Sequence, residues 1–207
     1  YESVYRALNS ALNAYGPLFA SLENDDHVAI AASGRMYKID DWAGVMGLHF
    51  ARQFEAYVSC LQAHHPARYV FAEDLKPDSL TRFKAILLVD ERVELEPELI
   101  QALQNAAAAG VKILYDGTCR PETVKDFTML GIRFDKLEKD PSPAGDDGAY
   151  WRFASYGESN RGALAQALDA VAPPAAGVDE GGILVSQRRA ENGAYVFVVN
   201  NTMPKLD

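Results

Sequence analysis

The chain has 207 residues, 48% of them hydrophobic and 24% charged, and a formal net charge of −9 at pH 7. A globular chain of this length buries about 70% of its unfolded surface, so a stable core needs neither a disulfide nor a metal. The acidic balance argues against nucleic acid as a partner, and no stretch approaches the ~18 apolar residues of a membrane span.

Residues 1–24 predict a helical leader. Val4, Leu8, Leu12 and Tyr15 recur at helical spacing as far as Gly16-Pro17, where we expect the helix to stop. The chain begins at Tyr1, with neither a methionine nor a signal peptide. We therefore interpret it as a piece of a longer protein, and the leader as a linker from an upstream domain.

The next residues predict a strand, a loop, a long helix and a second strand. The apolar stretch 27–32 predicts the first strand, and residues 33–39 read as a loop. Asp40-Asp41 then suits the N-terminal cap of a helix over residues 42–61, whose apolar face is rich in aromatic side chains. Residues 68–72 predict the second strand, followed by a connector as far as residue 83.

The stretch Phe83–Gly117 carries the clearest fold signal. Residues 85–89 and 111–115 are apolar runs of strand length, typical of strands covered on both faces. Between them Pro97 suits the first turn of a helix, and Gly110 can end it in the left-handed conformation. The pattern predicts a right-handed βαβ crossover, whose ligand-binding loops follow the carboxyl ends of the strands.

The last third of the chain predicts less regular structure and then a hairpin. Asn192-Gly193 separates two strand patterns, at residues 183–189 and 194–199, and Asn-Gly is a strong hairpin signal. Ahead of the hairpin we expect a helix over 121–130, a strand over 132–137, a surface loop over 138–148, a strand over 150–153 and a helix over 162–171.

These elements predict an α/β protein with three layers and a mostly parallel, flavodoxin-like sheet of about five strands, followed by a C-terminal β-hairpin. We divide the chain into a leader (1–24), an α/β domain (25–175) and a hairpin extension (176–207). The extension can be the start of a β-sandwich.

Cys119 is the one candidate nucleophile. Class I glutamine amidotransferases, which share this order of elements, place a cysteine on a sharp turn after a strand and a histidine on a later strand. Here no histidine follows Cys119, and the segment lacks a G-x-C-x-G pattern. We interpret Cys119 as a buried or capping thiol, and a stand-alone amidotransferase-like hydrolase with a reactive Cys119 is the alternative.

Neither a metal nor a cofactor is expected. His64 and His65 are adjacent, so on a regular helix they point about 100° apart and cannot easily hold one ion. No G-x-G-x-x-G pattern follows the first strand, which argues against a dinucleotide. The paired carboxylates lie at expected loops and helix starts, where capping and solvation explain them.

Five residues after two of the expected strands form a candidate binding rim. If the first and fourth strands are neighbours, their following side chains share one edge of the sheet, where aromatic faces beside hydrogen-bonding groups suit a sugar or a partner surface. For Trp42 the alternative is packing of its helix against the core. The candidate substrate-binding residues are Arg35, Tyr37, Trp42, Asp116 and Arg120.

The succession of segments resembles a known family. VAIAASGRMYKIDDW, FARQFEAYVSCLQAHHPARYVFAEDL and SLTRFKAILLVDERVELEPELIQALQNAAAAGVKILYDG are similar to the β-galactosidase trimerisation module, the amidotransferase-like domain that follows the catalytic barrel of several glycoside hydrolases. The likeness covers residues 28–117 well and residues 117–171 only by pattern, and the closing hairpin looks like the start of the sandwich that often follows this module.

The resemblance implies a non-catalytic part of a glycoside hydrolase, without the amidotransferase triad. Such a module mediates self-association, contacts a catalytic barrel that is not among these residues, and can wall a neighbour's sugar site. Besides the amidotransferase-like hydrolase, a small-ligand binding domain that uses the rim is a further alternative. The sequence does not indicate a compartment, a parent substrate or an oligomer size.

Overall fold

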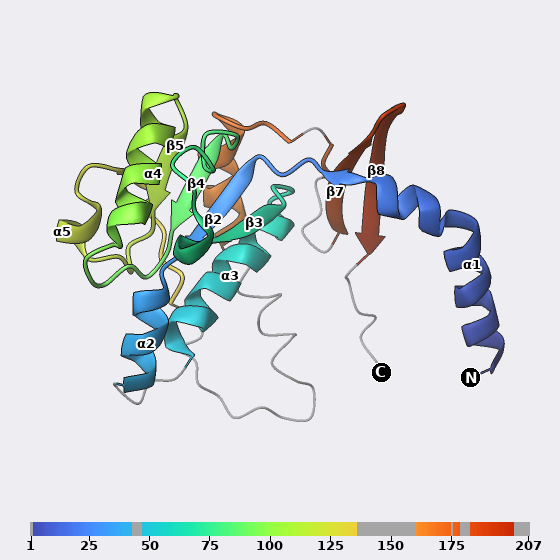
Figure 1. Cartoon of the computed structure of the whole chain (residues 1–207), viewed down its shortest axis with the longest axis horizontal. Helices are drawn as coiled ribbons and strands as arrows, with labels where there is room; N and C mark the ends of the chain where they lie inside the picture. The colour runs from blue at the N-terminus through green and yellow to red at the C-terminus, as the bar shows by residue number, and fades with distance from the viewer. Residues whose placement is uncertain (1, 43–46, 136–159, 175, 179–182, 201–207) are drawn as a thin grey trace.

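A parallel five-stranded sheet forms the centre of the computed structural model, which describes residues 2–42, 47–135, 160–174, 176–178 and 183–200 (Figure 1). The strands lie in the order β3-β2-β4-β5-β6. Their bounds are β2 Val28–Ala32, β3 Ala67–Phe71, β4 Ala85–Leu88, β5 Lys112–Tyr115 and β6 Thr128–Met129. Numbered among themselves, the strands follow the flavodoxin-like order 2-1-3-4-5. The predicted fold class is confirmed.

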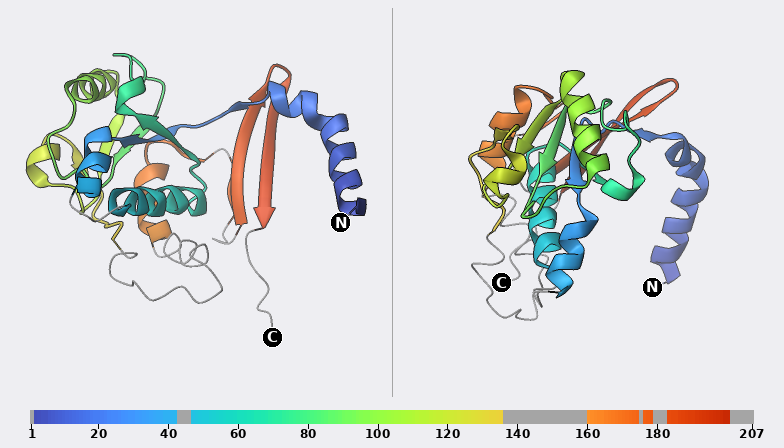
Figure 2. Two further views of the ribbon diagram at one scale, coloured as in Figure 1. Left: turned by 60° about the horizontal axis from the view of Figure 1, so that its bottom comes forward. Right: turned by 60° about the vertical axis from the view of Figure 1, so that its left-hand side comes forward.

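Helices cover both faces of the sheet and give the predicted three layers (Figure 2). On one face α4 (Pro97–Ala108) packs its buried side chains against alternate residues of β2, β4 and β5. On the other face, α3 (Leu48–Gln62) and the helical segment 160–169 cover the intervening residues. Each central strand is thus apolar on both faces, which explains the continuous hydrophobic runs of the sequence.

The βαβ unit forms as predicted. Pro97 is the first residue of α4, where its missing N–H has no partner to lose. After the helix, Gly110 has φ +90°, which glycine adopts without a steric penalty. The chain then enters β5, which lies parallel to β4.

The single long helix predicted over residues 42–61 begins too early, and the loop predicted over residues 33–39 is helical instead. The structure has two helices, α2 (Gly34–Trp42) and α3. Gly47, at φ +83°, precedes α3 and marks the break. In α2 the buried residues Met36 and Asp40 are one helical turn apart. The polar residues around them concealed this period.

The prediction for residues 121–137 is also corrected. The helix α5 covers only Pro121–Val124, and β6 then pairs with β5 in place of a strand beginning at residue 132. The backbone carbonyl of Ile132 accepts a hydrogen bond from Gly117, and Phe134 is fully buried. These residues cross the strand ends instead of extending the sheet. The predicted elements at 138–148 and 150–153 lie outside the described residues.

The leader is a single helix, α1 (Glu2–Ser21), which continues through Pro17 where we expected it to stop. Proline removes one helical hydrogen bond and bends a helix without necessarily ending it. Figure 1 shows α1 extending away from the α/β body. No described helix has the length and apolar character needed to cross a membrane.

The predicted hairpin is confirmed as β7 (Ile183–Ala190) and β8 (Gly193–Asn200). It stands beside the α/β body and gains a third strand, β1 (Glu23–Asn24), which pairs with β7 (Figure 1). The sheet therefore combines the leader with the hairpin extension. The three-segment division of the chain remains a prediction.

His64 joins the hairpin sheet to the body. Its ring nitrogen Nε2 lies 3.0 Å from the carbonyl oxygen of Ile183, and Nδ1 lies 3.4 Å from the backbone nitrogen of Val178. A neutral ring with its proton on Nε2 satisfies both contacts, because Nε2–H donates and Nδ1 accepts. His64 also has φ +62°, an uncommon conformation for a residue other than glycine.

We expect His64→Ala to loosen this joint without unfolding the body, because the alanine removes both contacts. Amide hydrogen exchange at Val178 and along β7 should become about tenfold faster, because the variant loses the net free energy that one hydrogen bond contributes. Exchange in β4 should not change. The matched control is His64→Gln, whose amide can still donate and accept. Equal acceleration in β4 would contradict a local role.

Candidate functional site

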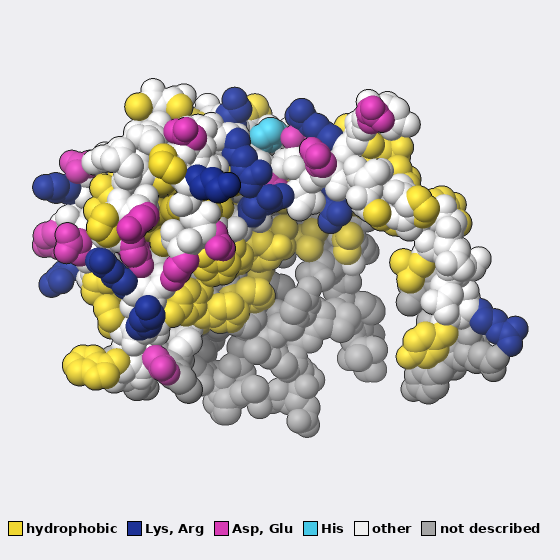
Figure 3. All heavy atoms as spheres, in the orientation of Figure 1, with side chains coloured by type: hydrophobic (Ala, Val, Ile, Leu, Met, Phe, Trp, Pro, Cys, Tyr) yellow, Lys and Arg dark blue, Asp and Glu magenta, His cyan; other side chains and the backbone are white. Residues whose placement is uncertain are grey.

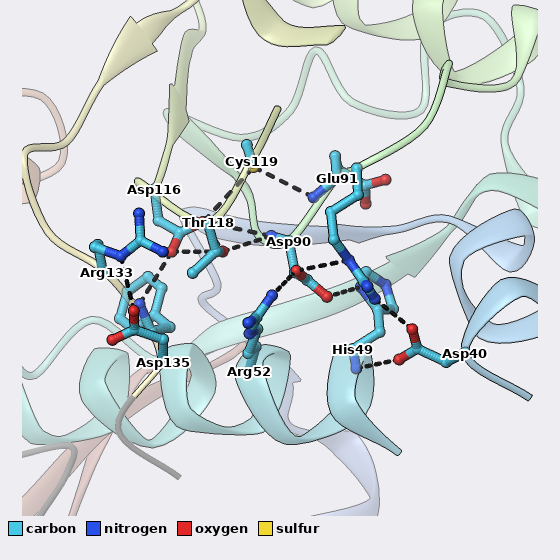
Figure 4. A network of polar contacts seen from close by, with 12 residues as sticks. Asp40, His49, Arg52, Asp90, Glu91, Asp116, Thr118, Cys119, Arg133 and Asp135 are labelled. Atoms are coloured by element: carbon cyan, nitrogen blue, oxygen red, sulfur yellow. Dashed lines mark hydrogen bonds and ion pairs between the residues drawn. The ribbon is translucent and has the colours of Figure 1, made fainter. Parts of the chain in front are cut away.

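The candidate site lies where the strand order reverses, between the carboxyl ends of β2 and β4. In open α/β sheets this position is the usual place for a ligand. Here it holds a set of polar side chains that we call the strand-end network. Figure 4 labels seven of them, Asp40, His49, Arg52, Asp90, Glu91, Asp116 and Thr118. The other three members are Ser33, Arg92 and Glu96.

Asp90 is the centre of the network. It directly follows the apolar run of β4, is fully buried, and has φ +59°, a conformation that aspartate tolerates better than most residues. Its carboxylate contacts Arg52 Nη1, and lies 3.3 Å from His49 Nδ1 and 3.0 Å from Arg92 Nε. Its charge is thereby compensated by basic groups from α3 and from its own loop.

Asp40 carries the network onto α2. One of its oxygens accepts a hydrogen bond from the backbone N–H of His49 at 2.5 Å, and the other pairs with Arg92. A carboxylate at the first turn of a helix satisfies an otherwise unpaired N–H and interacts favourably with the helix dipole. The predicted N-cap at Asp40-Asp41 is wrong, because both residues lie within α2 and the N-cap residue of α3 is Gly47; Asp40 reaches the first turn of α3 from the neighbouring helix.

Asp116 ties the end of β5 to the network. Its carboxylate accepts hydrogen bonds from the Thr118 hydroxyl at 2.6 Å and from the backbone N–H of Phe134 at 3.0 Å, while the backbone N–H of Asp90 lies 3.3 Å away. Burial raises the pKa of Asp116, although these hydrogen bonds oppose the rise. The residue is a buried acceptor for local backbone, not an open binding group.

Glu91 is the exception to this pairing. It is fully buried, and its carboxyl oxygens have no close side-chain hydrogen-bond partner among the described residues; the backbone of Ser33 and the charge of Arg92 stabilise the ionised form only weakly. Figure 4 shows its side chain directed away from the Asp90 carboxylate. Burial raises its pKa well above the ordinary value, and the charges of Glu96 and Asp90 add to this effect. A buried carboxyl group without a partner favours its neutral form.

Glu96 closes the network on the side of β2. Its Oε1 atom accepts hydrogen bonds from the Ser33 hydroxyl at 2.9 Å and from the backbone N–H of Arg35 at 3.1 Å. The Arg35 guanidinium donates to the backbone carbonyl of Glu94 at 3.2 Å. These contacts fix the start of α2 to the loop that follows β4.

Cys119 does not have the surroundings of a nucleophile. Its sulfur lies 3.4 Å from both the backbone nitrogen of Glu91 and the carbonyl oxygen of Leu88, and 3.6 Å from Asp116 Oδ1. Burial and the Asp116 carboxylate raise the pKa of its thiol. A reactive cysteine needs the opposite conditions, namely an exposed sulfur and a nearby base or positive charge.

The five predicted rim residues do not form one rim. The first and fourth predicted strands are β2 and β5, and β4 lies between them, so the expected adjacency is wrong. Arg35, Tyr37 and Trp42 all lie on α2, whereas Asp116 is buried. Arg120 borders a groove of about 960 Å³ between α4 and α5. Trp42 is 91% exposed, which contradicts the alternative of core packing.

Sequence reasoning placed Asp90 in a loop at the carboxyl end of a strand, but it missed His49 and Arg52, which contact this residue. Both lie on the buried side of α3 with Ala56 and Cys60. The available signal was that these polar residues recur at helical spacing on the buried face of α3. Only the order of the strands shows which residues they contact. Among the described residues no three His, Cys, Asp or Glu side chains form a group that could hold a metal ion.

Comparisons with known proteins find only distant structural similarity. No protein family model matches the chain, and no curated protein matches it either. Among solved structures, the α-L-fucosidase isoenzyme 2 from Paenibacillus thiaminolyticus, a glycoside hydrolase, aligns with a TM-score of 0.39 and 14% identity. The alignment covers 56% of this chain and 17% of the fucosidase chain.

We expect Asp90→Asn to destabilise the protein by about 3–5 kcal/mol, because it removes the buried charge opposite Arg52 while keeping the shape of the side chain. Asparagine also tolerates the positive φ, so backbone strain does not confuse the result. Urea unfolding measures the effect. Asp126→Asn, at an exposed position, is the control and should change stability by less than about 0.5 kcal/mol. A similar small loss at Asp90 would contradict the central role of this carboxylate.

Glu91 should make the fold less stable as the pH rises. A carboxyl group whose pKa is raised in the folded state contributes fully below its unfolded pKa, and this stability is lost as the pH rises through the folded value. We therefore expect Glu91→Gln to be more stable than the parent at pH 8 and to gain little near pH 4. Thermal unfolding across this range measures the difference, with the exposed Glu94→Gln as control. Parallel pH profiles for parent and variant would contradict the argument.

Proposed function

We propose that the chain is a non-catalytic accessory and oligomerisation module of a glycoside hydrolase. One contrast carries the proposal. The place where this fold usually binds a ligand is filled by the protein's own ion pairs, whereas large apolar side chains remain exposed on α1 and β8. Such a chain has surfaces suited to protein contacts and no assembled catalytic centre at its strand ends.

The strand-end network argues for a structural role. Asp90 and Arg52 satisfy each other within the core, and Asp116 accepts hydrogen bonds from neighbouring residues. A catalytic carboxylate or thiol must reach a substrate atom at hydrogen-bonding distance. The buried contacts of this network hold α2, α3 and the loop after β5 on the sheet instead.

The exposed apolar residues argue for a protein partner. On β8, Val196, Val198 and Val199 are each at least half exposed. The strand is also an outer strand of its sheet and has no charged residue or proline, the usual protection of a free edge. On α1 the side chains of Tyr5, Leu12 and Tyr15 are also more than half exposed. Both surfaces suit association with another folded surface.

The assignment to a glycoside hydrolase rests on the sequence resemblance to the trimerisation module. That likeness is carried by residues 28–117, which fold into β2, β3, β4 and β5 with their helices. In such a parent enzyme the catalytic acid and nucleophile would lie in a separate barrel. The partners are then a second copy of the chain and that barrel.

The alternative is an amidotransferase-like hydrolase with Cys119 as nucleophile. It requires a thiolate, so Cys119 should react quickly with iodoacetamide in the native protein at pH 8. Our proposal expects slow alkylation of native Cys119 and rapid alkylation after unfolding, because burial keeps the thiol protonated. Mass spectrometry of the labelled peptide separates Cys119 from Cys60.

We expect the chain to self-associate, and light scattering at several concentrations measures it. Val198→Lys places a charge on the exposed face of β8 and should weaken association by about tenfold or more, as for a residue central to an interface. Met129→Lys is the matched control, since Met129 is similarly exposed on the edge strand β6 and should have little effect. A strict monomer at high concentration would contradict self-association of this chain.

A further inference from the structure

Trp42 is the most exposed large apolar side chain among the described residues, at 91%. It is the last residue of α2, which lies on the side of the α/β body away from the hairpin sheet (Figure 1). Indole is a large flat surface with one polar atom, and folding usually covers at least part of it. An indole presented in this way offers one flat face to a ligand.

A shallow depression, mostly apolar in its lining, lies beside Trp42 on the same helix. It has a volume of about 350 Å³ and is lined by Tyr37, Lys38, Asp40, Asp41 and Gly47. Lys38 and Trp42 are four residues apart on α2 and therefore neighbours on one side of the helix. Figure 3 shows apolar and charged side chains together at this free end of α2 (lower left).

The strand-end network holds one side of this depression rigid. The Tyr37 hydroxyl donates to Gln53 Oε1 at 3.1 Å, and its ring meets the His49 ring edge-on at 4.9 Å. Asp40 is buried and engaged by Arg92 and by the backbone of His49. These contacts fix the tyrosine ring and the first turns of α2, so the depression is largely formed before any ligand arrives.

Two charged groups of the depression remain available. Lys38 and Asp41 are exposed, and neither makes a hydrogen bond or an ion pair with another described residue. Asp41 can accept hydrogen bonds from hydroxyl groups and Lys38 can donate to hydroxyl oxygens. One cation and one anion beside a flat aromatic face suit a neutral ligand with several hydroxyl groups and one apolar face.

We propose that the end of α2 binds a neutral pyranose sugar, with Trp42 stacking on the C–H face of the ring and with Lys38 and Asp41 bonding its hydroxyl groups. The net charge of −9 disfavours an anionic sugar. The inference deepens the proposed function, because it names the ligand that an accessory module of a glycoside hydrolase would contact. It uses α2 alone and leaves Asp116 and Arg120 out of the site.

Saturation-transfer NMR and calorimetry on the whole chain test the site with three probes: methyl β-D-galactopyranoside, D-glucose and D-galacturonic acid. We expect saturable binding of at least one neutral sugar and weaker binding of the uronic acid. Trp42→Ala should weaken binding by about tenfold, the upper range for one aromatic contact, and Trp42→Phe should retain part of it. Asp41→Asn should also weaken it. Because Trp42 is exposed, these variants should keep the parent's unfolding temperature.

Met129→Ala on β6 is the control, since Met129 is an exposed apolar residue outside α2 and outside the proposed association surfaces, and its loss should not affect sugar binding. The inference is overturned if no probe binds, if Trp42→Ala binds as well as the parent, or if Trp42→Ala alters only self-association. Self-association is measured separately on β8 variants. Sugar binding can therefore fail while the accessory and oligomerisation role stands. A strict monomer that still binds sugar would instead contradict self-association and support the sugar site.

Discussion

The buried carboxylate of Asp90 is the interaction on which the structure at the carboxyl ends of the strands depends. It follows a strand that is apolar on both faces, and its charge must be compensated where water is excluded. Arg52 compensates it from α3, and Arg92 connects it to Asp40 on α2. Ion pairs thus help to position α2 and α3 on the sheet. Their orientation in turn sets where the end of α2 lies.

The same compensation is consistent with the proposed structural role of this edge of the sheet. An ion pair with both partners in the core stabilises one arrangement of helices, and it leaves no charged oxygen free for a substrate. The unpaired groups lie farther out, on the exposed end of α2 and along β8. The proposed sugar site on α2 and the proposed association surface on β8 lie apart, so a ligand at one need not compete with a partner at the other (Figure 1).

Much of the fold could be predicted from the sequence because its central signals are local. Pro97, Gly110 and the apolar runs beside them fix one crossover, and Asn192-Gly193 fixes the hairpin. The candidate site was only partly predictable. Trp42 was named for its chemistry, but grouping it with Asp116 needed the order of strands, which no local pattern contains. Arg52 was not identified because its role depends on its contact with Asp90, which lies 38 residues later in the sequence.

The three-stranded sheet has a consequence for how the chain reaches its native state. Glu23 pairs with Arg189, so the strands that close this sheet come from opposite ends of the chain. The body between them is built from neighbouring segments, and hairpins and crossovers of this kind form early because little chain entropy is lost in bringing them together. We therefore expect docking of β1 on β7 to be a late step in folding. During synthesis β1 stays unpaired until Arg188 and Arg189 have left the ribosome.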